Sequence, residues 1–357
     1  MADAKAVDAG TLQIDLKAPD PALLTALSQN AGLVSSPKAF TAADIKTNPI
    51  GSGPYVLDTK ATVPGSSYTF TKNPSYWAPS SVHYDKVVMK VFNDVNSMLN
   101  AIKGNQLNAA NLLDNSTVDQ VKAAGYTINP QELDWTGLIL FDREGKLAKP
   151  LADVKVRQAL SYAFDRDAML KAIDKSFGTK TTQIFPKSSP AYDAALDNFY
   201  TYDVAKAKQL LTEAGYPNGF ELSMPSSTMV PSSTWSIIAS QLKEIGVTVK
   251  YTDAGNNFIS DMLASKYPAT WMRLQQDPTA WQIATFSITP NAVFNPFKTA
   301  DPKIDAWTKT IQTGTDAESA AAAKELNKFI VEQAWFVPWY RVQSSFATDA
   351  KTSMKVQ

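Results

Sequence analysis

Short alternating segments and helical patterns follow one another along most of the 357 residues. A strand is predicted where apolar and polar residues alternate, and a helix where apolar residues recur every three or four positions. The expected strands are 11–17, 55–57, 67–71, 87–92, 108–113, 126–129, 135–141, 220–224, 247–251 and 269–274. The expected helices are 21–28, 97–103, 117–124, 153–174, 204–214, 234–245, 259–265, 304–312 and 317–334. This succession predicts an α/β protein.

The helix expected over 153–174 has a clear start, because Asp153 is a good N-cap. Leu160 and the other apolar residues of this segment fall on one face of a helix. Arg157 and Arg166 lie among acidic residues, which predicts a solvated face with weak ion pairs. These charges are therefore expected to be structural and not part of a site.

Composition and charge fit a globular protein of about two domains. Hydrophobic residues make up 44% of the chain, and the 34 basic residues equal the 34 acidic ones. The balance gives no reason to expect nucleic acid or an anionic membrane as a partner. The chain has no cysteine, which excludes disulfides, zinc–thiolate sites and thiol nucleophiles. No apolar run is long enough to predict a membrane-spanning helix.

Two short segments near the start are rich in turn-forming residues. Asn48 to Tyr55 reads Asn-Pro-Ile-Gly-Ser-Gly-Pro-Tyr and predicts a turn that leads into a β-hairpin. A phosphate-binding loop would need a helix at this point, and a strand is predicted instead. Asn73 to Trp77 reads Asn-Pro-Ser-Tyr-Trp and predicts a second turn. Tyr76 and Trp77 are expected to be core anchors.

With Val156 to Arg166 (Val-Arg-Gln-Ala-Leu-Ser-Tyr-Ala-Phe-Asp-Arg) and Tyr202 to Pro217, these segments resemble the extracellular solute-binding proteins, family 5, of peptide/nickel-type ABC importers. The resemblance extends over almost the whole chain, because 335–342 is similar to a late strand of the family. It implies a two-lobed periplasmic-binding-protein-like α/β fold of type II. Lobe one would comprise residues 1–134, with the end of an inserted subdomain, and lobe two residues 135–285. The chain would return to lobe one over 286–357.

The resemblance also implies a function. Such a protein captures a solute between its lobes, closes about crossings near Trp135 and Phe286, and delivers the solute to an ABC permease in the membrane. It implies a monomer without enzymatic activity, cofactor or nucleic-acid partner. It also implies an extracytoplasmic location, in the periplasm or as a lipoprotein. The first residues, Met1 to Asp8, carry acids and no apolar stretch, so the signal segment and part of lobe one are expected to lie upstream of this chain.

Other functions remain open on the sequence alone. A glycosidase needs two carboxylates across a cleft, which a sequence cannot place. A peptide-binding chaperone is a further alternative, although no motif indicates it. The only histidine, His83, is expected at the surface, and a serine triad or a metal site would need partners that its spacing does not provide. A nickel site made by the protein is not expected, which leaves organic solutes.

One segment bears on the identity of the solute. Thr270 to Pro278 resembles the cleft loop of the family, in which an acidic residue three positions before the Asp-Pro pair binds the α-amino group of a peptide. Leu274 stands at that position here. Arg273 is expected to repel an amine. Asp277 is expected either to contact the ligand or to cap a helix.

Tryptophans and glutamines indicate a second class of solute. Trp135, Trp235, Trp271 and Trp281 fall near the expected cleft, and Gln275 follows Arg273 in the cleft loop. Indole faces and amide groups suit sugar rings, which have apolar faces and hydrogen-bonding edges. The predicted ligand is therefore an oligopeptide or an oligosaccharide. The predicted ligand-binding residues are Trp135, Trp235, Trp271, Arg273, Gln275, Asp277 and Trp281.

Overall fold

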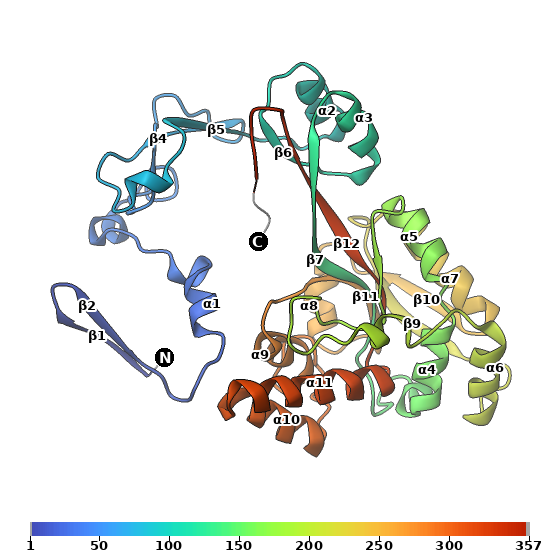
Figure 1. Cartoon of the computed structure of the whole chain (residues 1–357). Coiled ribbons are helices and arrows are strands. Elements are labelled where there is room, and N and C mark those ends of the chain that lie inside the picture. Colours follow the sequence, from blue (N-terminus) through green and yellow to red (C-terminus); the bar gives the residue numbers. More distant parts are fainter. Residues whose placement is uncertain (1, 355–357) are drawn as a thin grey trace. The chain divides into compact units, whose positions relative to one another are not determined.

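The computed structural model describes residues 2–354, which form two compact units (Figure 1). Within the described part, unit 1 contains residues up to 22, residues 128–346 and residue 354, and unit 2 contains residues 23–127 and 347–353. The predicted α/β class is confirmed by the helices and strands in both units. The lobe boundaries expected at 135 and 286 stay a prediction.

Unit 1 contains the longer helices and the main sheet. Its helices are α4 (Val154–Tyr162), α5 (Arg166–Asp174), α6 (Val204–Glu213), α7 (Ser232–Glu244), α8 (Phe258–Leu263), α9 (Ala280–Ile283), α10 (Pro302–Thr313) and α11 (Asp316–Glu332). Its strands are β1 (Asp3–Asp8), β2 (Thr11–Asp15), β7 (Thr127–Leu140), β8 (Gly178–Lys180), β9 (Glu221–Ser226), β10 (Thr248–Asp253), β11 (Ala269–Gln275) and β12 (Phe336–Thr348). The first residue of β7 and the last two of β12 belong to unit 2.

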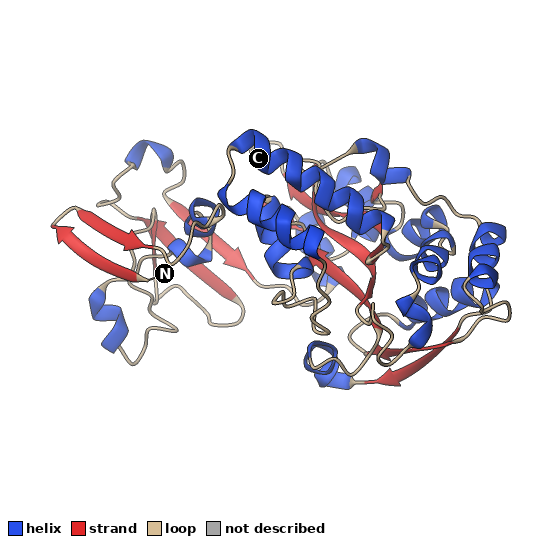
Figure 2. Ribbon diagram, turned by 90° about the horizontal axis from the view of Figure 1, so that it is seen from below, coloured by secondary structure: helices blue, strands red, loops and turns tan. Residues whose placement is uncertain are grey.

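The long strands β7 and β12 form the centre of the main sheet. The strand order is β11-β7-β12, and β8 also pairs with β12. A separate parallel pair is made by β9 and β10, and β1 pairs with β2. Figure 2 shows the strands of the main sheet among the helices of unit 1.

The sheet brings the backbones of β7 and β12 very close at Gly137. A Cβ atom at this position would lie 2.2 Å from the carbonyl oxygen of Val337. Real Cβ atoms do not approach backbone oxygens this closely, so only glycine fits here. The close packing of β7 against β12 therefore explains the glycine in the Trp-Thr-Gly sequence of the predicted strand.

Four arginines are buried in unit 1, and this corrects the expectation of a solvated charged face. Arg157 and Arg166 are 4% and 6% exposed. Arg157 donates to the carbonyl oxygens of Gln333 and Leu151, and Arg166 to that of Pro338. Gln333 and Pro338 lie far away in the sequence, so the local charge pattern could not reveal this burial.

Unit 2 consists of short elements. Its helices are α1 (Leu23–Leu27), α2 (Val95–Lys103) and α3 (Val118–Ala123). Its strands are β3 (Tyr55–Leu57), β4 (Ser67–Lys72), β5 (Lys86–Lys90) and β6 (Ala109–Asn111). The predicted hairpin is confirmed, because β3 pairs antiparallel with β4, and β4 pairs with β5. His83 is exposed, as expected.

Some predicted elements are wrong in extent. The helix expected over 153–174 is two helices, because the side chain of Asp165 caps α5 by accepting from the backbone N–H of Ala168. The strands expected at 126–129 and 135–141 are one strand, β7, which pairs with β11 over residues 134–140. The strands β1 and β8 were not predicted.

The role expected for Trp77 is also wrong. Its side chain is 83% exposed, and its ring lies 5.5 Å from that of the half-buried Tyr76. Trp77 therefore anchors no core among the described residues.

Candidate functional site

The cleft segment predicted from the sequence forms strand β11 in unit 1. β11 pairs antiparallel with β7, and this register places Gln275 opposite Asp134 and Arg273 opposite Thr136. Side chains alternate along a strand, so Trp271, Arg273 and Gln275 share one face. Leu274, on the other face, is buried.

Arg273 forms an ion pair with Asp134 on this face. The Nε atom of Arg273 lies 2.8 Å from Oδ2 of Asp134, and the two side chains are 42% and 25% exposed. The charge of Arg273 is therefore balanced within the sheet. The expectation that Arg273 repels an amine considered the arginine alone. It needs correction, because the carboxylate of Asp134 lies beside the guanidinium.

A second ion pair lies two residues earlier on β7. Glu132 accepts hydrogen bonds from Lys187 Nζ at 3.0 Å and from the hydroxyl of Thr179 at 2.7 Å. Glu132 and Asp134 share a face of β7 because they are two residues apart. We call Glu132, Asp134, Lys187, Arg273 and Gln275 the polar strand face.

Sequence reasoning missed Glu132, Asp134 and Lys187. The Glu-x-Asp alternation directly before Trp135 is a signal that could have identified the two acids as neighbours on one face of a strand. Lys187 lies 55 residues from Glu132, and nothing in the sequence connects them.

Trp135 and Trp235 lie in the core of unit 1. Trp135 is 2% exposed and contacts Phe336 edge to face, with 5.8 Å between the ring centroids. Trp235 is 8% exposed, and its Nε1 donates to the carbonyl oxygen of Ser227. In the described structure these two indoles present little surface to a solute.

Trp271 and Trp281 are half-buried and pack against the same core. The Trp271 ring meets the Trp235 ring edge to face at 5.7 Å. Its Nε1 has no hydrogen-bond partner among residues 2–354. Of the four predicted tryptophans, Trp271 is thus the one that is partly exposed and lies on the same face of β11 as Arg273 and Gln275.

Asp277 follows β11 and is half-buried. Burial raises the pKa of its carboxyl group. The alternative role expected for it, capping a helix, is wrong for α9. Thr279 caps this helix, because its hydroxyl accepts from the backbone N–H of Gln282. The assignment of Asp277 and the other six residues to ligand binding stays a prediction.

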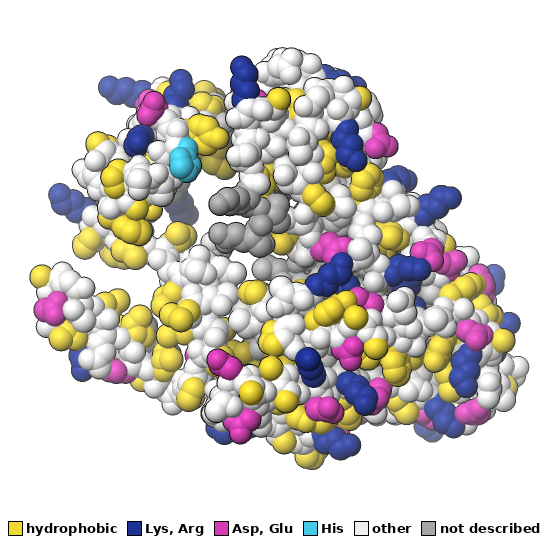
Figure 3. Space-filling view, viewed as in Figure 1, with side chains coloured by type: hydrophobic (Ala, Val, Ile, Leu, Met, Phe, Trp, Pro, Cys, Tyr) yellow, Lys and Arg dark blue, Asp and Glu magenta, His cyan; other side chains and the backbone are white. Residues whose placement is uncertain are grey.

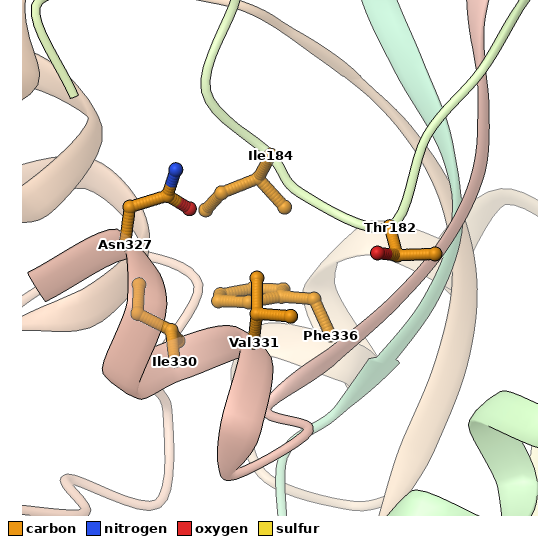
Figure 4. Close-up of a pocket in the computed structure, with 6 residues that line it drawn as sticks. All are labelled: Thr182, Ile184, Asn327, Ile330, Val331 and Phe336. Atoms are coloured by element: carbon orange, nitrogen blue, oxygen red, sulfur yellow. The ribbon is translucent and has the colours of Figure 1, made fainter. Parts of the chain in front are cut away.

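A small pocket lies elsewhere in unit 1 (Figure 4). Its volume is about 10 Å³, and its lining residues are Thr182, Ile184, Asn327, Ile330, Val331 and Phe336. This is about the space that one water molecule needs. The pocket is too small for the predicted solutes.

Among the described residues, no three His, Cys, Asp or Glu side chains gather in a way that could hold a metal ion. No helix in the described part of the chain is long and apolar enough to cross a membrane.

Comparison with known families gives a match over residues 1–304, to the family described as "Bacterial extracellular solute-binding proteins, family 5 Middle". The chain belongs to this family. The resemblance noted in the sequence is thereby confirmed. The family description also supports an extracellular location.

A similar curated relative is the glutathione-binding protein GsiB of Salmonella typhimurium, with 29% identity over 270 residues. The match covers 71% of this chain and 50% of GsiB, so the chain spans about half the length of this relative.

Solved structures confirm the fold class. DppA from Helicobacter pylori, in complex with the peptide STSA, has a TM-score of 0.77 and 21% identity, over 99% of this chain and 70% of DppA. NikA from Brucella suis, in complex with Fe(III)-EDTA, has a TM-score of 0.81 and 20% identity, over 100% of this chain and 76% of NikA. Both likenesses support the fold that the sequence predicts.

Proposed function

We propose that this protein is the solute-binding component of an ABC importer and that its ligand is an oligopeptide. The observation that best supports the proposal is the polar strand face. It lies in a chain that belongs to the solute-binding family. The protein would act as a monomer outside the cytoplasmic membrane and deliver its solute to a permease. Closure of the protein around the ligand would be driven by the binding energy.

The charges on the polar strand face favour a peptide. Asp134 and Glu132 supply carboxylates for an ammonium group, and Arg273 supplies a guanidinium whose remaining N–H groups suit a carboxylate. A peptide has both charged ends and amide groups along its backbone. The names of GsiB, a glutathione-binding protein, and of DppA with a bound peptide support the same class of ligand.

An oligosaccharide is the second candidate. The half-exposed Trp271 beside the exposed Gln275 offers an aromatic surface and an amide, the two features that bind sugars. The burial of Trp135 and Trp235 leaves fewer aromatic surfaces for a sugar than the sequence suggests.

Thermal unfolding and calorimetry with tri- and tetrapeptides and with oligosaccharides test the proposal. A saturable rise in Tm with peptides only is expected, because a ligand that binds the native state stabilises it. Saturable binding of an oligosaccharide alone would replace the peptide by the second candidate. If neither class binds, the proposed function is wrong for this chain.

Substitution of Trp271 tests where the solute binds. Trp271→Ala should weaken peptide binding about tenfold or more, since a loss of 1.4 kcal/mol corresponds to a factor of ten. Trp77→Ala is the matched control, because Trp77 is exposed and lies in unit 2. Equal affinity of the Trp271→Ala variant and the control would remove Trp271 from the site.

A further inference from the structure

Arg143 carries N–H groups that meet no acceptor in the part of the chain that the structure describes. It follows β7 in unit 1 and is 5% exposed. Its Nη1 donates to Oδ1 of Asn295 at 3.1 Å. Its Nε and Nη2 are buried and have no hydrogen-bond partner among residues 2–354. In a guanidinium these two nitrogens lie on one edge, which is the edge that binds anions in a fork.

The charge of Arg143 is not balanced by a carboxylate in the described part of the chain. None of the ion pairs between residues 2 and 354 includes it. The neighbouring Asp142 accepts from three backbone N–H groups, and Glu144 pairs with Lys146. Burial, and then the like charge of Arg157, lower the pKa of Arg143. A guanidinium nevertheless stays protonated at neutral pH, so a buried charge remains that no described residue balances as a counter-ion.

The acceptor that Arg143 contacts, Asn295 Oδ1, is shared with a second donor. Asn295 Oδ1 accepts from Arg143 and from the backbone N–H of Thr299, which uses both of its lone pairs. The hydroxyl of Thr299 is buried and has no partner among the described residues. The guanidinium lies 4.0 Å from the centre of the Trp335 ring, a contact that favours the cation but accepts none of its in-plane N–H groups.

We propose that the Nε and Nη2 edge of Arg143 binds a small monovalent anion such as chloride or formate. The site offers a buried cation and, among the described residues, unpartnered guanidinium N–H donors, which is the chemistry that selects an anion over a metal ion. An anion at a buried site must lose most of its hydration shell, so chloride is favoured over sulfate or phosphate. The bound ion would connect the end of β7, the segment 295–299 and the start of β12, and so stabilise unit 1.

Thermal unfolding of the 357-residue protein in sodium chloride, formate or gluconate at one ionic strength tests the site. The expected result is a saturable rise in Tm with chloride or formate that gluconate, a bulky anion, does not produce. Arg143→Gln should lose this rise. Lys328→Gln, which removes an exposed ion pair with Glu332, should retain it. Equal Tm values in all three salts would overturn the proposal.

A measurement on the unmodified protein keeps the proposal testable if Arg143→Gln does not fold. Crystals grown in sodium bromide should show an anomalous peak beside Nε and Nη2 of Arg143. Density for water without an anomalous signal at this position would overturn the anion assignment.

Discussion

The two units of this protein differ in the side chains that they bury: unit 1 buries most of its arginines, whereas unit 2 leaves several large apolar side chains exposed. All five arginines lie in unit 1, and Arg143, Arg157, Arg166 and Arg341 are buried there. Unit 2 has neither arginine nor glutamate. Large apolar side chains of unit 2 are instead exposed, among them Leu24, Leu33, Phe40 and Trp77, at 78–83%. In Figure 3 the visible face of unit 1 carries many interspersed charges of both signs.

The difference shows what a deep core makes possible. In unit 1, long strands and helices on several sides enclose guanidinium groups, and backbone carbonyl groups of Gln333 and Pro338, far along the chain, accept from Arg157 and Arg166. The core of unit 2 is small and centres on α2 and α3, where Leu99, Ile102, Val118 and Val121 are buried. Its other elements are too short to enclose large side chains. We therefore expect unit 1 to provide most of the stability of the chain.

The largest expected effect comes from the ion pair between the buried Arg341 and the half-buried Asp197. Asp197 accepts from Arg341 Nη2 at 2.7 Å and also from Thr181, Gln183 and Tyr192. Asp197→Ala leaves Arg341 buried without its counter-charge, so the free energy of unfolding should fall by about 3–5 kcal/mol. Denaturant unfolding measures it. Glu332→Ala, which breaks an exposed pair with Lys328, is the control, with an expected loss of about 0.5 kcal/mol or less.

The pH dependence of the stability tests whether the charge of the Asp197 carboxylate is the cause of this effect. Burial raises the pKa of Asp197, but hydrogen bonds from Arg341, Tyr192 and Thr181 outweigh this and hold it below its ordinary value of 3.8. A lowered pKa in the folded state means that the carboxylate stabilises the protein at neutral pH. This stabilisation is lost as the pH falls through the lowered pKa. Similar losses for Asp197→Ala and Glu332→Ala at pH 7 would contradict the role given to the pair.

Two leucines, one in each unit, allow the cost of removing a buried and an exposed side chain to be compared directly. Leu160 is fully buried in α4, whereas Leu33 of unit 2 is 78% exposed. Leu160→Ala should cost about 2–5 kcal/mol, because it leaves a cavity in a packed core. Leu33→Ala should change the free energy of unfolding by about 0.5 kcal/mol or less. Equal costs in denaturant unfolding would show that Leu33 is covered in solution and that the contrast between the units is wrong.

The smallest expected effect concerns Asp277 in the candidate site. Burial raises the pKa of this carboxyl group, so the folded state disfavours its charged form. The resulting cost is present above the raised pKa and disappears below the ordinary value of 3.8, where folded and unfolded chains are both protonated. Asp277→Asn should therefore raise Tm slightly at pH 7, by about 1 °C or less in a chain of this length. At pH 3 the variant and the original protein should have the same Tm; an unchanged difference there would exclude ionisation as the cause.

Much of the fold could be predicted from local patterns. The helix over 204–214 and the strand over 269–274 appear as α6 and β11 within a residue or two, because apolar periodicity, caps and turns act over short distances. The break at Asp165 was missed, since a capping residue inside a periodic segment resembles any other polar position. The strands β1 and β8 lack a strong pattern and depend on pairing with other strands.

The candidate site could be predicted only in part. The segment with Trp271, Arg273 and Gln275 was identified in the sequence, and the structure places these residues on one face of β11. Asp134 could not be assigned as the partner of Arg273, because the two are 139 residues apart and meet only through strand pairing. The burial of Trp135 and the exposure of Trp77 were likewise decided by packing.

The sequence alone determined the α/β class, most helices and strands, and the motifs that match the solute-binding family. These properties depend on residues close together in the chain, where periodicity and turn chemistry act. The tertiary structure alone decided that four arginines are buried, that Arg273 is balanced by Asp134, and that Nε and Nη2 of Arg143 meet no acceptor among residues 2–354. Each of these depends on which distant segments surround a side chain, and the free energy of a buried charge is set by those surroundings.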